Sequence, residues 1–259
     1  MGKASHNELP GIRLERARSW LRGKPQGPVF LEIFPTAACN LDCRFCWRQV
    51  LKTAPQELTD QRLCRLADEA VELGVLEVCI KGGGEPILRR SFIEYAAKRF
   101  SEGGVLTQLI TNGTLFDEKL CALLVDCGWD DVALSVDAAL PDIHDRLRGK
   151  AGAFEKTVQA AADFKKLKRA AKTMLPLVSM HCVLTNLNYL QPGELLRLAA
   201  GLEMSHVTFD SMGMGAPACR TLALSPAQLD EFDAHIDQWL ALAKELGVHT
   251  NLDSFKKKG

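Results

Sequence analysis

The sequence VFLEIFPTAACNLDCRFCW, residues 29–47, contains a mostly apolar run that ends at Pro35 and is followed at once by three cysteines. A short, nearly continuous apolar run is typical of a parallel strand that is buried on both faces. Cys39, Cys43 and Cys46 have the spacing C-x3-C-x2-C. Because parallel sheets bind ligands beyond the carboxyl ends of their strands, this stretch predicts both a sheet and the edge that carries its site.

Five more runs of the same kind follow, and amphipathic segments separate them. Six strand–helix units in sequence predict an α/β protein with a parallel sheet and right-handed crossovers. Eight units would close a TIM barrel, so six predict an open, partial (β/α)6 TIM barrel. The expected strands are Val29–Pro35, Val75–Lys81, Val105–Thr111, Asp131–Asp137, Leu177–Leu184 and Val207–Met212.

Several helix ends are marked by capping residues. Asp117 and Ser225 each stand immediately before an amphipathic segment, so each is expected to begin a helix. Ser91–Glu94 has the S-x-x-E pattern of a capping box, which predicts another helix start there. Gly247 is expected to end the last helix, because glycine adopts the left-handed conformation that commonly closes a helix.

The composition argues against several classes of protein. Lys plus Arg and Asp plus Glu number 32 each, so the formal net charge is zero and no basic footprint for nucleic acid is present. The lysines at positions 256–258 are too few to change that. The sequence has no apolar run of 18 residues and no apolar signal core, so a cytoplasmic protein without a membrane or nucleic-acid partner is expected.

Nine cysteines in a cytosolic chain indicate metal binding or catalysis sooner than disulfides, although the six outside the triplet are expected to be small buried side chains. A structural zinc site uses four ligands, but no second C-x2-C occurs and no histidine lies within 30 residues of the triplet. Three thiolates on a [4Fe–4S] cluster would leave one iron open. A cluster is therefore the favoured interpretation, with zinc or buried cysteines as alternatives.

This spacing, with the aromatic Phe45 before the last cysteine, resembles the signature of the radical S-adenosylmethionine (SAM) superfamily, and the resemblance extends from Val29 to at least Gly247. It implies that the three cysteines hold a [4Fe–4S] cluster, that SAM binds the open iron, and that Phe45 lies beside these cofactors. It also implies reductive cleavage of SAM to a 5′-deoxyadenosyl radical, which abstracts hydrogen from an organic substrate. An electron donor such as flavodoxin or ferredoxin, and anaerobic conditions, are expected.

The resemblance assigns the methionine part of SAM to the next strand ends. The sequence KGGGEP, residues 81–86, is similar to the family's GGE motif, which puts Gly83, Gly84 and Glu85 beside the amino group of SAM. A tight turn is the alternative interpretation of these glycines. Asn112, in the Asn-Gly pair after the third strand, is a further expected contact.

The fourth strand and the segment after it supply more expected SAM contacts. Ser135 and Asp137 are two residues apart and so lie on one side of the strand, where they suit a ribose diol; the alternative is that Asp137 caps the next turn. The sequence HDRLRG, residues 144–149, is similar to a motif of relatives that carry a C-terminal SPASM or twitch cluster domain. It makes Arg148 the expected partner of the SAM carboxylate.

The last two predicted strands are expected to hold the adenine and to face the substrate. Backbone and apolar contacts at these strand ends are expected to hold the adenine, from Val183, Leu184 and either Met212 or Phe209. Asp210 and Ser211 are expected substrate contacts, whereas His181 is interpreted as a residue of the core or one that supports the site from behind.

We therefore expect an N-terminal helical extension (1–28), a radical SAM core (29–247) and a tail (248–259). The similar molybdenum-cofactor, quinone-cofactor and peptide maturases carry further cysteines in an auxiliary domain, but none follows Cys219 here. The tail is either the start of a missing or truncated domain or the end of a short enzyme. Modification of a peptide or of a small natural product such as a sugar is expected. The rival is a non-catalytic iron–sulfur protein for electron transfer or redox sensing.

Overall fold

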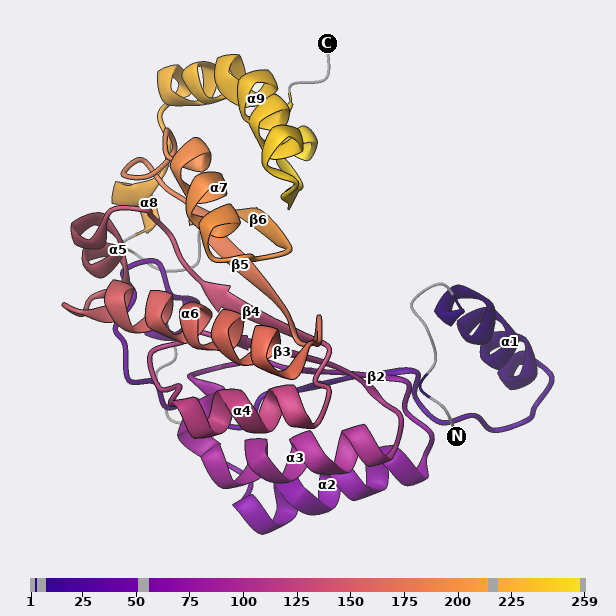
Figure 1. Cartoon of the computed structure of the whole chain (residues 1–259). Helices are drawn as coiled ribbons and strands as arrows, with labels where there is room; N and C mark the ends of the chain where they lie inside the picture. Colours follow the sequence, from indigo (N-terminus) through magenta and orange to yellow (C-terminus); the bar gives the residue numbers. More distant parts are fainter. Residues whose placement is uncertain (1–2, 4–7, 51–55, 214–218, 257–259) are drawn as a thin grey trace.

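One parallel sheet of seven strands forms the centre of the computed structural model, which describes residues 3, 8–50, 56–213 and 219–256 (Figure 1). The strands stand in sequence order, and every neighbouring pair is parallel. They are β1 Phe30–Ile33, β2 Glu77–Ile80, β3 Leu106–Thr111, β4 Asp131–Ser135, β5 Leu177–Leu184, β6 His206–Ser211 and β7 His249–Thr250. Within the described residues β1 and β7 do not pair with each other, so the barrel is open, as predicted.

Helices connect the strands and pack along the outer face of the sheet (Figure 1). Along that face α2 contacts α3, α3 contacts α4, α4 contacts α6, and α7 contacts α9. None of the helices in the described part of the chain is long and apolar enough to cross a membrane. The helices are α1 Leu9–Leu21, η1 Trp47–Val50, α2 Asp60–Glu72, η2 Pro86–Arg89, α3 Arg90–Glu102, α4 Glu118–Asp126, α5 Pro141–Arg148, α6 Ala153–Ala171, α7 Pro192–Gly201, α8 Cys219–Leu222, α9 Pro226–Leu246 and η3 Leu252–Phe255, where η marks a 3-10 helix.

Most helix ends follow from the capping residues in the sequence. The Asp117 side chain accepts a backbone hydrogen bond in the first turn of α4, and Ser225 forms a capping box at the start of α9. Gly247 ends α9 with a φ of 68°. The capping box predicted at Ser91 is wrong, because η2 runs directly into α3. Arg89 is therefore the N-cap, and Ser91 lies inside the first turn.

The core lies between the outer face of the sheet and the helices. On β4, for example, Val132 and Leu134 are completely buried against this core, while Asp131 and Ser135 alternate onto the concave face. Burying each such aliphatic side chain contributes about 1.5–3 kcal/mol. The apolar face therefore stabilises the sheet and leaves the concave face available for polar side chains.

Helix α1 contacts the barrel through arginines. Arg13 pairs with Glu77 of β2, and Arg16 donates to the backbone carbonyl of Gly74 at 2.6 Å. Leu14 and Trp20 are exposed on this helix. The division of the chain into extension, core and tail remains a prediction, and positions 257–259 lie outside the described residues.

Candidate functional site

A cavity of about 160 Å³ opens at the carboxyl ends of the first four strands, and the three cysteines line it. Segments far apart in the sequence meet there: the cysteine loop, the loops after β2 and β3, the end of β4 and the last residue of α5. The predicted site residues that line it are Cys39, Cys43, Cys46, Gly83, Gly84, Glu85, Asn112, Ser135 and Arg148. The structure thus gathers most of the predicted site in one place.

The glycine loop after β2 packs directly on the cysteine loop. Gly84 N donates to Thr36 O and Glu85 N donates to Ala38 O, both at 2.8 Å. A Cβ atom on Gly84 would lie 1.8 Å from the Ala38 carbonyl oxygen, far inside van der Waals contact. Only glycine therefore allows the two loops to approach this closely.

Glu85 is 2% exposed and joins the ends of β2 and β3. One carboxylate oxygen accepts from Thr111 Oγ1 at 2.6 Å and from Ile87 N at 3.0 Å, and the other accepts from Asn112 N at 2.9 Å. Burial raises the pKa of Glu85, while these hydrogen bonds oppose the rise. The sequence assigned Glu85 to the amino group of SAM, whereas the structure shows both oxygens engaged within the protein.

Asp137 is completely buried and pairs with Arg148, with Oδ2 2.6 Å from Nε. The other carboxylate oxygen accepts from Val183 N at 3.0 Å. The Arg148 guanidinium lies against the Phe45 ring, 5.5 Å from its centroid, and points Nη1 toward Cys43 Sγ. The structure therefore places Asp137 beneath the cavity, where it holds Arg148, rather than in the cavity beside a ribose.

Burial and neighbouring charges shift the pKa values of Arg148 and Cys43. Burial lowers the pKa of Arg148, but the charges of Asp137 and Cys43 more than offset this, so the net pKa is raised. Burial raises the pKa of the Cys43 thiol, and the Arg148 charge opposes that rise. Arg148 is thus a permanent cation that stabilises a thiolate at Cys43.

Five cavity residues were not predicted from the sequence: Gly82, Ile110, Thr111, Trp47 and Arg48. Arg48 donates from Nη1 to Ala37 O at 3.1 Å and from Nη2 to Leu41 O at 3.2 Å, so it braces the loop that carries the cysteines. For Trp47 and Arg48, the only signal in the sequence was their position directly after Cys46.

Of the two positions expected for His181, the structure excludes the core and leaves the one beside the site. His181 is the register partner of Ser135, so both side chains lie on the concave face. Its Nε2 is 3.0 Å from Asp210 Oδ2 on β6, and the two side chains are 31% and 48% exposed. The structure therefore adds a polar pair one strand away from the cavity wall at Ser135.

The remaining predicted contacts lie elsewhere. Leu184 and Met212 line a separate apolar cavity of about 180 Å³ together with Leu229 and Phe232 of α9. Val183 contributes its backbone N–H to Asp137. Phe45 and Val183 are not among the side chains that line the cysteine cavity.

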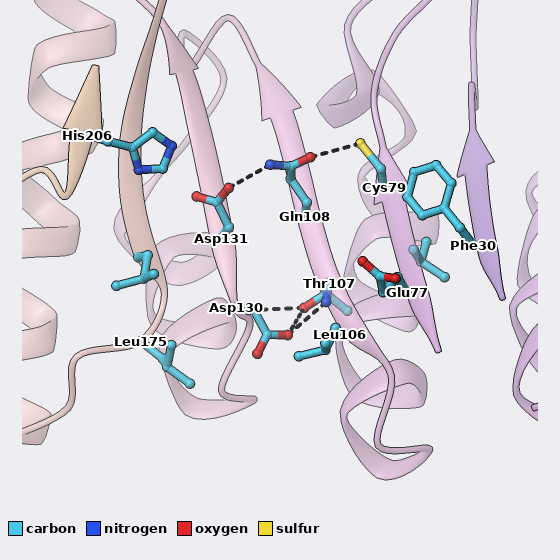
Figure 2. A pocket seen from close by; sticks show the side chains of 12 residues that line it. Phe30, Glu77, Cys79, Leu106, Thr107, Gln108, Asp130, Asp131, Leu175 and His206 are labelled. Carbon is cyan, nitrogen blue, oxygen red and sulfur yellow. Dashed lines mark hydrogen bonds between the residues drawn. The ribbon is translucent and has the colours of Figure 1, made fainter. Parts of the chain in front are cut away.

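A further cavity, of about 380 Å³, lies between the amino-terminal halves of the strands (Figure 2). Its polar groups mostly satisfy one another: Cys79 Sγ contacts Gln108, Gln108 donates to Asp131, and Asp130 accepts from Thr107. Burial raises the pKa of Cys79 to about 11, so this thiol is unreactive. The larger cavity therefore lacks the chemistry that the cysteine cavity has.

The donor set of the cysteine cavity fits a cluster better than a single ion. No three His, Cys, Asp or Glu side chains in the described ranges lie close enough to hold one metal ion. A tetrahedral zinc site would bring sulfurs to about 4 Å from one another, because Zn–S bonds are about 2.3 Å long. In a [4Fe–4S] cluster each thiolate binds a different iron, so the sulfurs stand farther apart. Three thiols that line one cavity, without being close enough together to hold a single ion, fit a cluster.

An open parallel barrel with a cysteine triplet at its carboxyl edge defines an α/β protein with a candidate cluster site. The family model of the radical SAM superfamily matches residues 33–199. The chain therefore belongs to the radical SAM superfamily.

Curated proteins resemble the chain in sequence, and solved structures resemble it in fold. PqqA peptide cyclase of Rhizobium meliloti (strain 1021) is 30% identical over 194 residues, which is 74% of this chain and 49% of the relative. Mycofactocin maturase MftC of Mycolicibacterium smegmatis is 33% identical over 176 residues, 67% of this chain and 42% of the relative. SuiB of Streptococcus suis bound to S-adenosylmethionine has a TM-score of 0.71 at 18% identity, covering 95% of this chain and 56% of that one, which shows the shared fold. The chain spans about half the length of the first relative and less of the second.

Proposed function

We propose that the chain is a radical SAM enzyme core in which Cys39, Cys43 and Cys46 hold a [4Fe–4S] cluster. When bound, the cluster supplies the electron that cleaves SAM to methionine and a 5′-deoxyadenosyl radical, which abstracts hydrogen from the substrate. The observation that carries this proposal is the convergence of the three thiols and the glycine loop on one cavity.

The other cavity residues would position SAM. The backbone of Gly83 and Gly84 lets the methionine part approach closely, and the amino group would lie near Glu85. Ser135 would offer its hydroxyl to the ribose, and Arg148 would offer the SAM carboxylate a guanidinium that is always charged.

We propose a peptide as the substrate class. Support comes from the relatives, whose names describe a peptide cyclase and a maturase, and from SuiB, whose structure has been solved with its precursor peptide SuiA. The concave face beside Ser135 offers the pair of His181 and Asp210, which suits hydrogen bonding to polar groups of a peptide.

A reducing cytoplasm fits the nine free cysteines, and flavodoxin or ferredoxin would deliver the electron.

Anaerobic reconstitution with iron and sulfide, followed by SAM and dithionite, tests the proposal. The expected result is about four irons per chain and formation of 5′-deoxyadenosine, which Cys43→Ala abolishes. A brown protein that binds iron but makes no 5′-deoxyadenosine would instead support the non-catalytic iron–sulfur protein. Product formation that survives in Cys43→Ala would contradict the assignment of the cluster.

A further inference from the structure

Two of the three cavity cysteines have a side-chain N–H group directed at their sulfur. Arg148 Nη1 lies 3.8 Å from Cys43 Sγ, and Asn112 Nδ2 lies 4.0 Å from Cys39 Sγ. Both donors are 7% exposed, so water competes little for these contacts. Within the described chain no side-chain nitrogen donates to the sulfur of Cys46, so the three cysteine sulfurs have different surroundings.

The orientation of the Asn112 amide is fixed by its own partners. Its Oδ1 accepts from Thr114 N at 2.9 Å and from Thr114 Oγ1 at 2.7 Å. The amide nitrogen therefore faces the opposite way, toward Asn40 Oδ1 at 2.9 Å and toward Cys39 Sγ. The donor is held in place before any cofactor binds.

The Arg148 guanidinium is held just as firmly. Asp137 binds it from below through Nε, the Phe45 ring packs against it, and Nη1 is left to face Cys43. The contact at Cys43 therefore combines a directed N–H group with the positive charge of the guanidinium, and both act on the sulfur in the same direction.

We infer that Arg148 and Asn112 are positioning residues that donate N–H···S hydrogen bonds to the Cys43 and Cys39 thiolates and raise the reduction potential of the cluster. This inference rests on the proposed function. A hydrogen bond to a ligand sulfur withdraws electron density from the cluster. It therefore favours the reduced state, which has gained one electron from the external donor and carries one more negative charge.

The experiment is a redox titration of the reconstituted full chain without SAM, followed by electron paramagnetic resonance, for the wild type, Arg148→Met and Asn112→Leu. At a fixed potential, each substitution is expected to lower the ratio of reduced to oxidised cluster about tenfold, which corresponds to a shift of about 59 mV to more negative potential. Arg146→Met is the matched control, because Arg146 lies on the same helix but is exposed; its potential should equal that of the wild type.

A second measurement does not depend on whether Arg148→Met and Asn112→Leu keep their cluster. Wild-type protein labelled with 15N-arginine should show a hyperfine coupling between the reduced cluster and one guanidinium nitrogen, and this coupling should persist in Arg146→Met. Unchanged potentials in variants with intact clusters, or no 15N coupling in the wild type, overturn the inference and leave the proposed function standing. A wild type that takes up no cluster overturns the proposed function, and the inference falls with it.

Discussion

The substitution Asp137→Asn tests whether the buried ion pair holds the site together. Asn keeps the size of the side chain and an oxygen that can accept from Val183 N, so the change mainly removes one negative charge. Arg148, only 7% exposed, then remains as a buried cation without a counterion. The Nε and Oδ2 atoms are 2.6 Å apart but are not aligned as a hydrogen bond, so charge is what holds them.

Removing one partner of a buried ion pair typically destabilises a protein by about 3–5 kcal/mol. A natural domain is stable by only about 5–15 kcal/mol, so this loss is a large share of the total. The pair of Asp137 and Arg148 has side chains that are 0% and 9% exposed, which places it in the buried class. We therefore expect the free energy of unfolding to fall by about 3–5 kcal/mol.

Urea unfolding of the cluster-free protein under reducing conditions measures this loss. Glu118→Gln is the control, because it breaks an ion pair with Lys166 whose side chains are 71% and 63% exposed, and it should change stability very little. The double variant Asp137→Asn/Arg148→Met should recover part of the loss, since no unpaired charge stays buried. If Asp137→Asn is as stable as the control variant, the ion pair does not hold Arg148 and the reasoning fails.

Two further predictions concern the cavity wall and the pH dependence of stability. Gly84→Ala should abolish cluster uptake, measured as iron per chain, because the new Cβ would lie 1.8 Å from the Ala38 carbonyl oxygen. Gly83→Ala is the control and should keep most of the iron, because its Cβ would lie 3.2 Å from the nearest atom. Equal uptake by both variants would contradict the packing argument. Burial, and then the Arg148 charge, lower the pKa of His144 to about 3. In the unfolded chain His144 binds a proton near pH 6.5, whereas in the folded protein it does not. As the pH falls from 7.5 to 5.5, this residue should therefore lower the free energy of unfolding by about 1.4 kcal/mol. Urea unfolding of His144→Asn at the two pH values should show a decrease that is smaller by this amount.

The fold was predictable because its signals are local. Each strand is a short apolar run, and the alternation of side chains within a strand puts Ser135 on the concave face and Leu134 in the core. The same rule shows why Val183 and Leu184 cannot both face one ligand: neighbouring residues of a strand point to opposite faces. If both residues contact adenine, one of them must do so through its backbone; the Leu184 side chain lines the apolar cavity that α9 also lines.

The partners of the buried charges were not predictable. Nothing in the local pattern around Asp137 says that its carboxylate turns inward to Arg148, because that choice depends on where α5 ends. Likewise, the three donors to Glu85 come from two different segments that only the folded sheet brings together. Sequence motifs thus identified the residues of the site, while the contacts that fix their orientation are set by tertiary structure.

The cysteine loop depends on its neighbours for its shape, and this explains why the site residues are spread over the chain. Asp42 N donates to Arg148 O at 3.2 Å and Arg44 N donates to Leu147 O at 2.9 Å, so the end of α5 supports one side of the loop. A Cβ on Gly149 would lie 2.2 Å from the Asp42 carbonyl oxygen, so this contact needs glycine just as the contact at Gly84 does. Two glycine contacts therefore hold the cysteine loop, one at Ala38 and one at Asp42. Because protein hydrogen bonds hold the loop, the thiols are positioned by the fold itself and need not be gathered by the cluster.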